Sequence, residues 1–348
     1  MSVTIYAIAE RAGVSSSTVA RALRGDAKLS GRSAERAARI RRIAQEMGYR
    51  PNWRAQAFSR CKTHAVGLFH THTAWIHEGT MGEIAGGFTM AMRDHGYHVV
   101  IVPYDAEGQW QELLKDGRLD GIAISHYLPD DAREAVEESG LPRVLLMDKT
   151  IPSWPCAVSD DLGGAYAATR RLIDLGHRRI AMYLHDSIRK HFSVEDRHAG
   201  YEKAMREAEL AHEIQFWHLP EERLPDVLFC GGDRPTAVLC YCHVEAMAVY
   251  LAAWQHQVRI PDELSVIAFN ELQYARYMTP PLSTMAFNTT HIGRVGANLL
   301  VRQIQSKDAE PERVVVAERL IERQSTAPPD KRKTTSAGRG RAASIQLR

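Results

Sequence analysis

The feature that most constrains the fold is a repeated alternation between short apolar runs and longer amphipathic segments. The apolar runs are 65–70, 97–103, 120–125, 143–147, 179–184, 236–242 and 264–269, and amphipathic segments such as 82–95, 161–175, 197–208 and 244–256 lie between them. Apolar strands that alternate with helices indicate parallel sheets with both faces covered. The pattern predicts an α/β body of two doubly wound lobes. Because such sheets bind ligands beyond the carboxyl ends of their strands, we expect a ligand cleft between the lobes.

The composition is that of a globular protein with more than one domain. The chain has 348 residues, 45% of them hydrophobic and 25% charged, which excludes a disordered or collagen-like chain. No apolar run approaches the roughly 18–20 residues of a membrane helix. The first residues, MSVTIYAIAERAG, lack the pattern of a secretory signal, and the five scattered cysteines do not form a disulfide framework. We therefore expect a cytoplasmic protein without a membrane partner.

The charge is divided unevenly along the chain. Residues 1–60 carry a formal charge of +8, residues 61–330 carry −12, and residues 331–348 carry +6. A basic head attracts the phosphate backbone of a nucleic acid, and an acidic body avoids binding it elsewhere. A solvated basic helix would carry the same charge. The residue pattern of the head therefore has to decide between a nucleic-acid-binding head and a solvated helix.

The head is predicted to be a helix-turn-helix followed by a third helix. Gly13 supplies a tight turn, Ser15 is a plausible N-cap for the second helix, Ser30 or Ser33 for the third, and Gly48 suits the end of the third. The apolar positions expected to face inward are Ile5, Ile8, Ala9, Val19, Ala22, Leu23, Ile40, Ile43, Ala44 and Met47. The second helix exposes a polar face that carries Arg21. Such a unit is typical of a reader of the DNA major groove, and a three-helix bundle with no DNA-binding role is the alternative.

Residues 49–60 are a candidate hinge. Pro51 interrupts the chain, Asn52 can cap, and 53–58 would make a helix too short to be stable alone. Such a helix would order only against its two-fold mate and a DNA minor groove, with Phe58 as an apolar wedge between base steps. A plain linker is the alternative.

Five stretches of the chain resemble the LacI/GalR family of transcriptional regulators. Residues 3–24 and 50–60 are similar to the DNA-binding head and hinge of that family. The body adds Asp161-x-x-Gly164-Ala165 running on to LGHRRIA at 175–181, IPDELSVIAFN at 260–270 and TPPLST at 279–284. The stretches follow the family's order across residues 3 to about 326. The resemblance implies a dimeric repressor whose body is like a periplasmic sugar-binding protein, in which an effector in the cleft repositions the lobes and so controls hinge order and operator affinity.

The resemblance and the alternation together predict the domain organisation. We expect a DNA-binding domain at 1–49, a hinge at 50–62, an effector-binding and dimerisation body at 63–326, and a disordered basic tail at 327–348. The lobes are expected at roughly 63–159 with 287–315 and at 160–286 with 316–326. Because the tail lacks the leucine heptads that would support a tetramer, we expect a homodimer without a cofactor.

The DNA-binding residues are implied by the resemblance. Ser16, Ser17 and Arg21 match the family's base readers, and an arginine can take guanine O6 and N7 together. Thr4, Tyr6, Thr18, Arg24 and Lys28 match positions that face phosphates, which set the register. The hinge contributes Asn52, Ala55 and Phe58. Phe58 replaces the usual leucine, which leaves the preferred central base step open, and region 30–48 is three residues longer than usual. The expected partner is a near-palindromic double-stranded operator with one head per half-site.

The effector-binding residues are implied in the same way. Asp148 stands at the lobe boundary where the family commonly has a carboxylate, Arg197 matches a family arginine that reaches the effector, and Asn270 stands where the family usually has aspartate. Carboxylate, guanidinium and amide groups suit the vicinal hydroxyls of a sugar. His70 and His72 end the first strand and could line the cleft, although an ordinary strand-end role is the alternative. Cys242-His243 stands where the family most often has Asn-Asp. This departure leaves open an acidic or aromatic effector, or a constitutive regulator with a vestigial cleft.

Several other signals favour structural interpretations. Cys240-x-Cys242-His243 suggests zinc, but its spacing is wrong for a zinc knuckle and both cysteines lie on a predicted buried strand, so core cysteines and no metal site are expected. The pairs Asp130-Asp131 and Asp160-Asp161 are interpreted as helix caps. A transport binding protein would need a signal peptide and no basic head. An enzyme would need a nucleophile with its base, or a phosphate-binding loop, and the sequence contains neither motif.

Overall fold

The computed structural model describes residues 3–24, 32–50, 62–70, 79–104, 108–125, 128–187, 191–230, 234–306 and 309–329. The chain separates into two compact units, residues 1–63 and residues 64–348. Each unit is described by itself. Among the described residues, no helix is both long and apolar enough to cross a membrane.

The first unit packs three helices around a small apolar core. The helices are α1 (Ile5–Ala12), α2 (Ser16–Arg24) and α3 (Arg32–Glu46). The predicted stripes meet in this core, where Ile8, Val19 and Ile40 are almost fully buried and Ile5, Leu23 and Met47 pack around the edge. The predicted positive φ of Gly13 is also confirmed, at 63°. The prediction of three helices in this segment is therefore confirmed.

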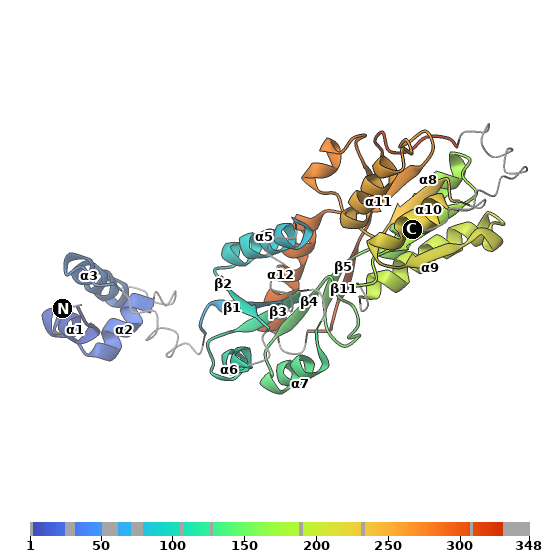
Figure 1. Ribbon diagram of the computed structural model, residues 1–348. Coiled ribbons are helices and arrows are strands. Elements are labelled where there is room, and N and C mark those ends of the chain that lie inside the picture. The colour runs from blue at the N-terminus through green and yellow to red at the C-terminus, as the bar shows by residue number, and fades with distance from the viewer. Residues whose placement is uncertain are drawn as a thin grey trace, which may run out of the picture. The chain divides into compact units, whose positions relative to one another are not determined.

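The first lobe of the second unit is built on a six-stranded sheet with the order β11-β5-β4-β3-β1-β2, and every pair of neighbouring strands is parallel. Its strands are β1 (Ala65–His70), β2 (His98–Pro103), β3 (Gly121–Ser125), β4 (Arg143–Leu146), β5 (Cys156–Ser159) and β11 (Arg313–Val316). Figure 1 shows α5 (Gly79–Asp94) and α12 (Thr289–Gln305) on one face of this sheet, and α6 (Gln109–Lys115) and α7 (Asp130–Ser139) on the other.

The second lobe is built on another six-stranded sheet, with the order β12-β10-β9-β8-β6-β7. Its strands are β6 (Ile180–Leu184), β7 (Gln215–His218), β8 (Ala237–Cys240), β9 (Ser265–Phe269), β10 (Ser283–Ala286) and β12 (Arg319–Ile321). Helices α8 (Asp161–Asp174) and α9 (Phe192–Glu207) share one apolar core with the sheet. Helices α10 (Leu224–Phe229) and α11 (His243–Gln255) share the other. The prediction of two doubly wound α/β lobes is confirmed, with the short strand β12 antiparallel to β10.

Three crossings of the chain join the two lobes. The chain leaves lobe one between β5 and α8, returns between β10 and α12, and leaves again between β11 and β12. Strands β5, β10 and β11 all end at a crossing. The carboxyl ends of the strands in each sheet therefore face the other lobe, which is where a ligand of such sheets binds.

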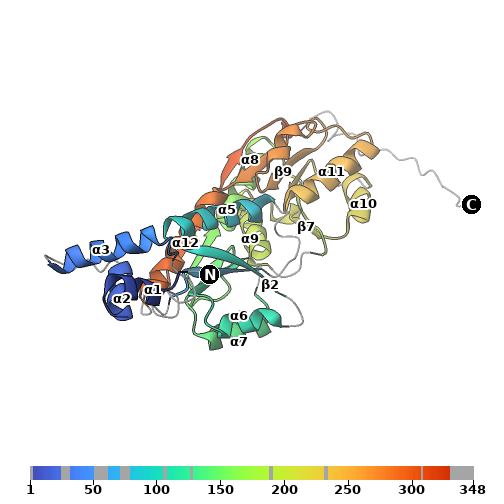
Figure 2. The same ribbon diagram turned by 90° about the vertical axis from the view of Figure 1, so that its left-hand side faces the viewer.

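Helices α5 and α12 cross at very close range, side by side in both views (Figures 1 and 2). A Cβ atom on Gly87 would stand closer than 3.0 Å to the carbonyl oxygen of Thr290, and one on Gly293 would stand equally close to the carbonyl oxygen of Ile84. Only glycine fits at these two positions. The crossing holds the amino-terminal end of α12, which follows the second crossing, against lobe one.

Glu318 is enclosed at the third crossing. Both of its carboxyl oxygens are buried and have no hydrogen-bond partner among the described residues. They lie against Gly164 of α8, where a Cβ atom would collide with them. Burial raises the pKa of this carboxyl from 4.5 to about 8; the charge of Arg197 opposes the rise, and Asp161 adds to it.

We expect Gly87→Ala to lower the free energy of unfolding by about 1–3 kcal/mol, because a methyl group forced into a packed contact strains the crossing. Gly86→Ala on the same helix is the matched control. Its Cβ atom would meet nothing within 4 Å, so it should raise stability by about 0.5–1 kcal/mol. Urea unfolding followed by tryptophan fluorescence measures both changes. Equal effects of the two variants would contradict the close crossing.

We expect the ionisation of Glu318 to make stability depend on pH. A carboxyl whose pKa is raised on folding binds more protons in the folded state, so stability is lost as the pH rises from about 4.5 to 8. Glu318→Gln removes this loss. The free energy of unfolding of the variant, relative to that of the natural chain, should therefore rise between pH 5 and pH 8. Urea titrations across this range test it, with the exposed Glu310→Gln as control. Parallel curves for the natural chain and Glu318→Gln would show that Glu318 does not titrate in this range.

Candidate DNA-binding head and effector cleft

The turn between α1 and α2 is fixed by local hydrogen bonds. The backbone N–H of Val14 donates to the Ala9 carbonyl at 3.1 Å. The hydroxyl of Ser15 accepts from the backbone N–H of Thr18 at 3.3 Å and lies 2.9 Å from the hydroxyls of Ser17 and Thr18. Arg41 of α3 donates to the Ala22 carbonyl at 2.9 Å and ties α3 to the second helix. The predicted cap at Ser15 is confirmed.

The polar face of α2 is turned outward. Ser17 and Arg21 are exposed, and Ser16 and Thr18 are half-buried. Tyr6 is 76% exposed on α1, where a side chain can meet a DNA backbone. Thr4 caps α1 by accepting from the backbone N–H of Ala7. The side chain of Arg24 lies outside the described part of the structure, as do Lys28, Asn52, Ala55 and Phe58.

Asp148 lies just beyond the carboxyl end of β4, on the side of lobe one that faces lobe two. One carboxylate oxygen accepts from the backbone N–H of Thr150 at 2.8 Å. The other, Oδ2, is buried without a hydrogen-bond partner among the described residues. Burial raises the pKa of this carboxyl, and the bonds from Thr150 oppose the rise. A buried acceptor without a donor is a position that a ligand hydroxyl would satisfy.

Arg197 is buried in lobe two, and two nitrogens of its guanidinium are already bonded. Its Nε donates to Asp161 at 2.7 Å and its Nη1 to the Tyr241 carbonyl at 2.5 Å, and the guanidinium stacks on the rings of Tyr241 and Phe269. Burial lowers its pKa, but the charge and hydrogen bond of Asp161, together with Tyr241 and Glu318, outweigh burial and raise it. The hydroxyl of Ser159 donates to the second oxygen of Asp161 at 2.8 Å. Arg197 therefore ties α9 to the start of α8 and to Tyr241 within lobe two.

The structure corrects one interpretation of the acidic pairs. Asp160 does cap α8, since its carboxylate accepts from the backbone N–H of Gly163. Asp161 is instead the fully buried partner of Arg197. At α7 neither member of the pair is the cap, because the helix begins after Pro129 and Asp131 accepts from the Tyr104 hydroxyl.

Cys242 and His243 begin α11 and do not belong to β8, which ends at Cys240. The expectation that Cys242 is a buried strand residue is therefore wrong. Its sulfur caps the helix by accepting from the backbone N–H of Val244, and Glu245 completes the capping box. The Nδ1 of His243 is buried without a partner among the described residues, and burial lowers the pKa of this ring. The described residues contain no group of three side chains placed to hold a metal ion.

The remaining predicted residues lie at strand ends. His70 is the buried last residue of β1. Asn270 follows β9 and has a φ of 67°, a left-handed conformation that asparagine adopts more readily than most residues. His72 lies outside the described residues.

A contact that sequence reasoning missed joins the two lobes beside Asp148. The Nε2 of His191 lies 2.9 Å from the Met147 carbonyl of lobe one, while its Nδ1 accepts from the backbone N–H of Ser193 and caps α9. Only a ring that carries hydrogen on Nε2 can make both bonds. Next to it, the ammonium group of Lys149 bonds to Asp196 and lies over the ring of Phe192. A histidine six residues before Arg197 has no local signal that predicts this role.

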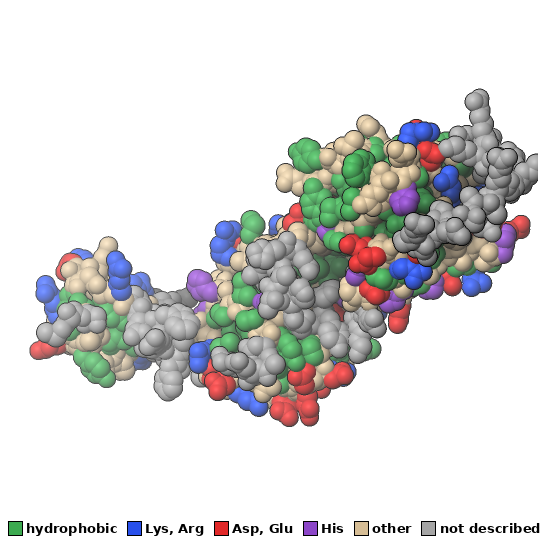
Figure 3. Space-filling model, in the orientation of Figure 1, with side chains coloured by type: hydrophobic (Ala, Val, Ile, Leu, Met, Phe, Trp, Pro, Cys, Tyr) green, Lys and Arg blue, Asp and Glu red, His purple; other side chains and the backbone are tan. Residues whose placement is uncertain are grey.

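Each lobe also exposes an apolar surface. Along α11, Val244, Met247, Leu251 and Trp254 are spaced as one helical stripe and are 44–77% exposed. Figure 3 shows apolar side chains gathered over this part of lobe two. Lobe one exposes Met90 on α5 and Val100 and Ile101 on the edge strand β2. Apolar patches of this kind mark protein interfaces.

Comparison with known proteins agrees with this architecture. Residues 4–52 match the family model "Bacterial regulatory proteins, lacI family", and residues 169–326 match "Periplasmic binding protein-like domain"; together they cover more than half of the chain. The chain is 27% identical to the HTH-type transcriptional regulator DegA of Bacillus subtilis over 94% of this chain and 99% of DegA. It is 28% identical to the ribose operon repressor of Haemophilus influenzae over 92% of this chain and 98% of that repressor.

A solved structure shares the fold. The chain is similar to the lac repressor dimer bound to operator and an anti-inducer, with a TM-score of 0.75 and 20% identity, over 94% of this chain and all of that one. The head, the two-lobed body and the relatives therefore confirm the resemblance drawn from the sequence. The protein is a DNA-binding transcriptional regulator, and the chain belongs to the LacI family of bacterial regulatory proteins.

Proposed function

We propose that the protein is a cytoplasmic, homodimeric repressor that binds a near-palindromic operator and is controlled by a sugar effector held between its lobes. The observation that carries the proposal is the exposed polar face of α2, on a packed three-helix head that is joined to lobes whose strand ends face each other. We propose the domain boundaries drawn from the sequence, and with them the hinge at 50–62.

Recognition of the operator is assigned to α2. Arg21 and Ser17 are exposed on one helix whose opposite side is buried in the core, so they are free to reach base edges. Ser16 stands beside them as a third base reader. Thr4, Tyr6, Thr18, Arg24 and Lys28 are assigned to phosphates, and Asn52, Ala55 and Phe58 to the centre of the operator. Two heads are needed for a near-palindromic site, because each reads one half-site.

The apolar surfaces support the homodimer. The α11 stripe on lobe two and the patch of Met90, Val100 and Ile101 on lobe one each leave large apolar side chains in water. A second copy of the chain would cover both surfaces in one symmetric interface. The lac repressor structure, which is a dimer on its operator, is consistent with this arrangement.

The contacts of the cleft favour a neutral effector rich in hydroxyl groups over an acidic one. Arg197 donates from Nε to Asp161 and from Nη1 to the Tyr241 carbonyl. Because Asp161 compensates its charge, Arg197 attracts an anionic effector only weakly. One open position is an acceptor, Oδ2 of Asp148, and an acceptor needs a donor from the ligand. Sugar hydroxyls supply such donors, and the ribose operon repressor is among the relatives. His70, His72, Cys242, His243 and Asn270 are assigned to the walls of this site.

Unsatisfied buried polar atoms also speak against a vestigial cleft. Oδ2 of Asp148 and Nδ1 of His243 are both buried without partners among the described residues, and each such atom carries a cost in stability unless a ligand uses it. An enzyme in the cleft would need a nucleophile beside a base. The buried groups of the cleft instead form structural ion pairs and caps.

For the DNA site, we expect Arg21→Ala to lose about 1–3 kcal/mol of binding to the selected operator and little on random DNA, because it removes a base contact. Lys28→Ala is the comparison. It should weaken both DNAs alike and flatten the salt dependence, because it removes a phosphate contact. Operator selection from random DNA, followed by fluorescence anisotropy at several salt concentrations, measures both. Equal losses on both DNAs for Arg21→Ala would exclude it as a base reader.

For the effector site, a thermal-shift screen of sugars, polyols, sugar acids and small aromatics comes first. A ligand at 100 times its Kd adds about 2.7 kcal/mol of stability. Asp148→Asn should then weaken binding of the neutral hit about tenfold, because the charged acceptor is lost, and should leave operator binding without effector unchanged. Asp130→Asn, exposed on α7, is the control. A hit restricted to acids, or full binding by Asp148→Asn, would contradict the neutral-effector proposal.

Arg197→Ala is a poorer probe of the same site. The substitution leaves Asp161 buried without its counter-charge, and breaking a buried pair in this way typically costs about 3–5 kcal/mol. A lost response in that variant would not separate effector binding from folding of lobe two.

A further inference from the structure

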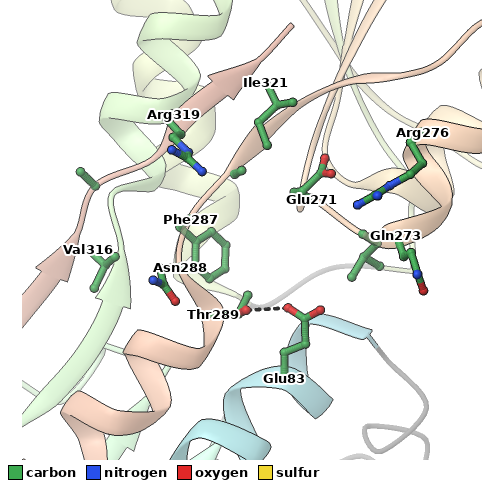
Figure 4. Close-up of a pocket in the computed structure, with 13 residues that line it drawn as sticks. Glu83, Glu271, Gln273, Arg276, Phe287, Asn288, Thr289, Val316, Arg319 and Ile321 are labelled. Carbon is green, nitrogen blue, oxygen red and sulfur yellow. Dashed lines mark hydrogen bonds between the residues drawn. The ribbon is translucent and has the colours of Figure 1, made fainter. Parts of the chain in front are cut away.

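A second pocket lies between the lobes, on the side of α5 and α12. It encloses about 690 Å³, which is within the usual range for small-molecule sites. Figure 4 shows its walls, which come from α5, from the segment after β9, from the second crossing and from the third. None of the residues assigned to the effector cleft lines it.

The two acidic side chains of this pocket are already engaged. The carboxylate of Glu83 on α5 accepts from the hydroxyl of Thr289 at 2.5 Å. Glu271 accepts from both terminal nitrogens of Arg323, at 2.9 and 2.5 Å, and also from the hydroxyl of Thr284. The bonds to Arg323 and Thr284 lower the pKa of Glu271 against the opposing effect of burial. The charge of Glu271 is therefore compensated by Arg323 within the protein, whereas Glu83 keeps its negative charge.

The two basic side chains are not engaged in this way. Neither Arg276 nor Arg319 has an ion pair or a side-chain hydrogen bond among the described residues, although the charge of Arg276 contributes to the low pKa of Glu271. In Figure 4 their guanidinium groups extend toward each other from opposite sides of the pocket. Both side chains are exposed, and their guanidinium groups are available to donate to a ligand.

The beginning of α12 adds further donors on a third side. Asn288 caps this 17-residue helix, and its Oδ1 accepts from the backbone N–H of His291. Its side-chain amide nitrogen remains a donor, and Asn288 and Thr289 both line the pocket. The N-terminus of α12, which carries the positive end of the helix dipole, lies at this side of the pocket.

We propose that this pocket binds a small oxyanion, a phosphate or carboxylate group of a metabolite, between Arg276, Arg319 and the start of α12. An arginine takes such a group through two parallel hydrogen bonds, and a helix N-terminus favours negative charge. The ligand would touch α5 of lobe one, the segment after β9 in lobe two, and two crossings. It would therefore favour the relative position of the lobes found here, from a site separate from the cleft that holds Asp148.

The test is direct binding to the full-length chain, with inorganic phosphate and succinate as separate probes at constant ionic strength. We expect saturable binding of at least one probe by calorimetry, and the stronger probe identifies the source of the oxyanion. Arg319→Gln and Arg276→Gln should each weaken it about tenfold, because a charged hydrogen bond is lost. Glu83→Gln should tighten it, because a negative charge leaves the pocket.

Arg206→Gln is the matched control, since Arg206 is an exposed arginine on α9. It should bind as the natural chain does. No saturable binding of either probe, or equal weakening in Arg206→Gln and the two pocket variants, would overturn the proposal. Binding is measured without DNA and without a cleft effector, so the result stands apart from the proposed repressor function.

Discussion

The ion pair between Arg197 and Asp161 is the interaction on which the junction of the two lobes depends. It is almost wholly buried, so its desolvation has to be offset by well-placed bonds, which the Tyr241 carbonyl and the Ser159 hydroxyl supply. Asp161 opens α8 directly after the first crossing, and Arg197 reaches it from α9. The pair thus fixes where the chain enters lobe two. The third crossing passes the same place, because Glu318 lies against α8 at Gly164.

Local pattern was enough to predict the head and most of the central strands. Ile8, Val19 and Ile40 recur at helical spacing, and Gly13 marks the turn, so each helix carries its own signal. Strands such as β1 are buried on both faces and appear as apolar runs. The strands β5, β7, β10, β11 and β12, which have three or four residues each, were not predicted. Their pairing depends on neighbours distant in sequence, as β11 shows beside β5.

The chemistry of the site was harder to predict than its position. The resemblance placed Arg197 and Asp148 in the cleft. It could not show that Arg197 forms an ion pair with Asp161, which is 36 residues away. An aspartate beside another at a helix start looks like a cap, and Asp160 is one. Cys242 looked like a strand residue because the apolar run continues through Tyr241, whereas the capping box with Glu245 starts a helix there. The lobe contact of His191 depends on tertiary structure alone.

The third crossing offers a route by which the two sides of the junction affect each other. Successive side chains of an extended segment point to opposite sides. Glu318 accordingly faces α8 and the Arg197 pair, whereas its neighbours Ala317 and Arg319 line the pocket beside α12. A ligand that holds Arg319 would restrain the backbone that also carries Glu318. Because Glu318 is a buried carboxyl next to Arg197, a shift of that backbone changes the electrostatic environment of the cleft floor. Coupling between the pocket and the cleft therefore needs no long pathway, because residues 318 and 319 are adjacent in the same backbone segment.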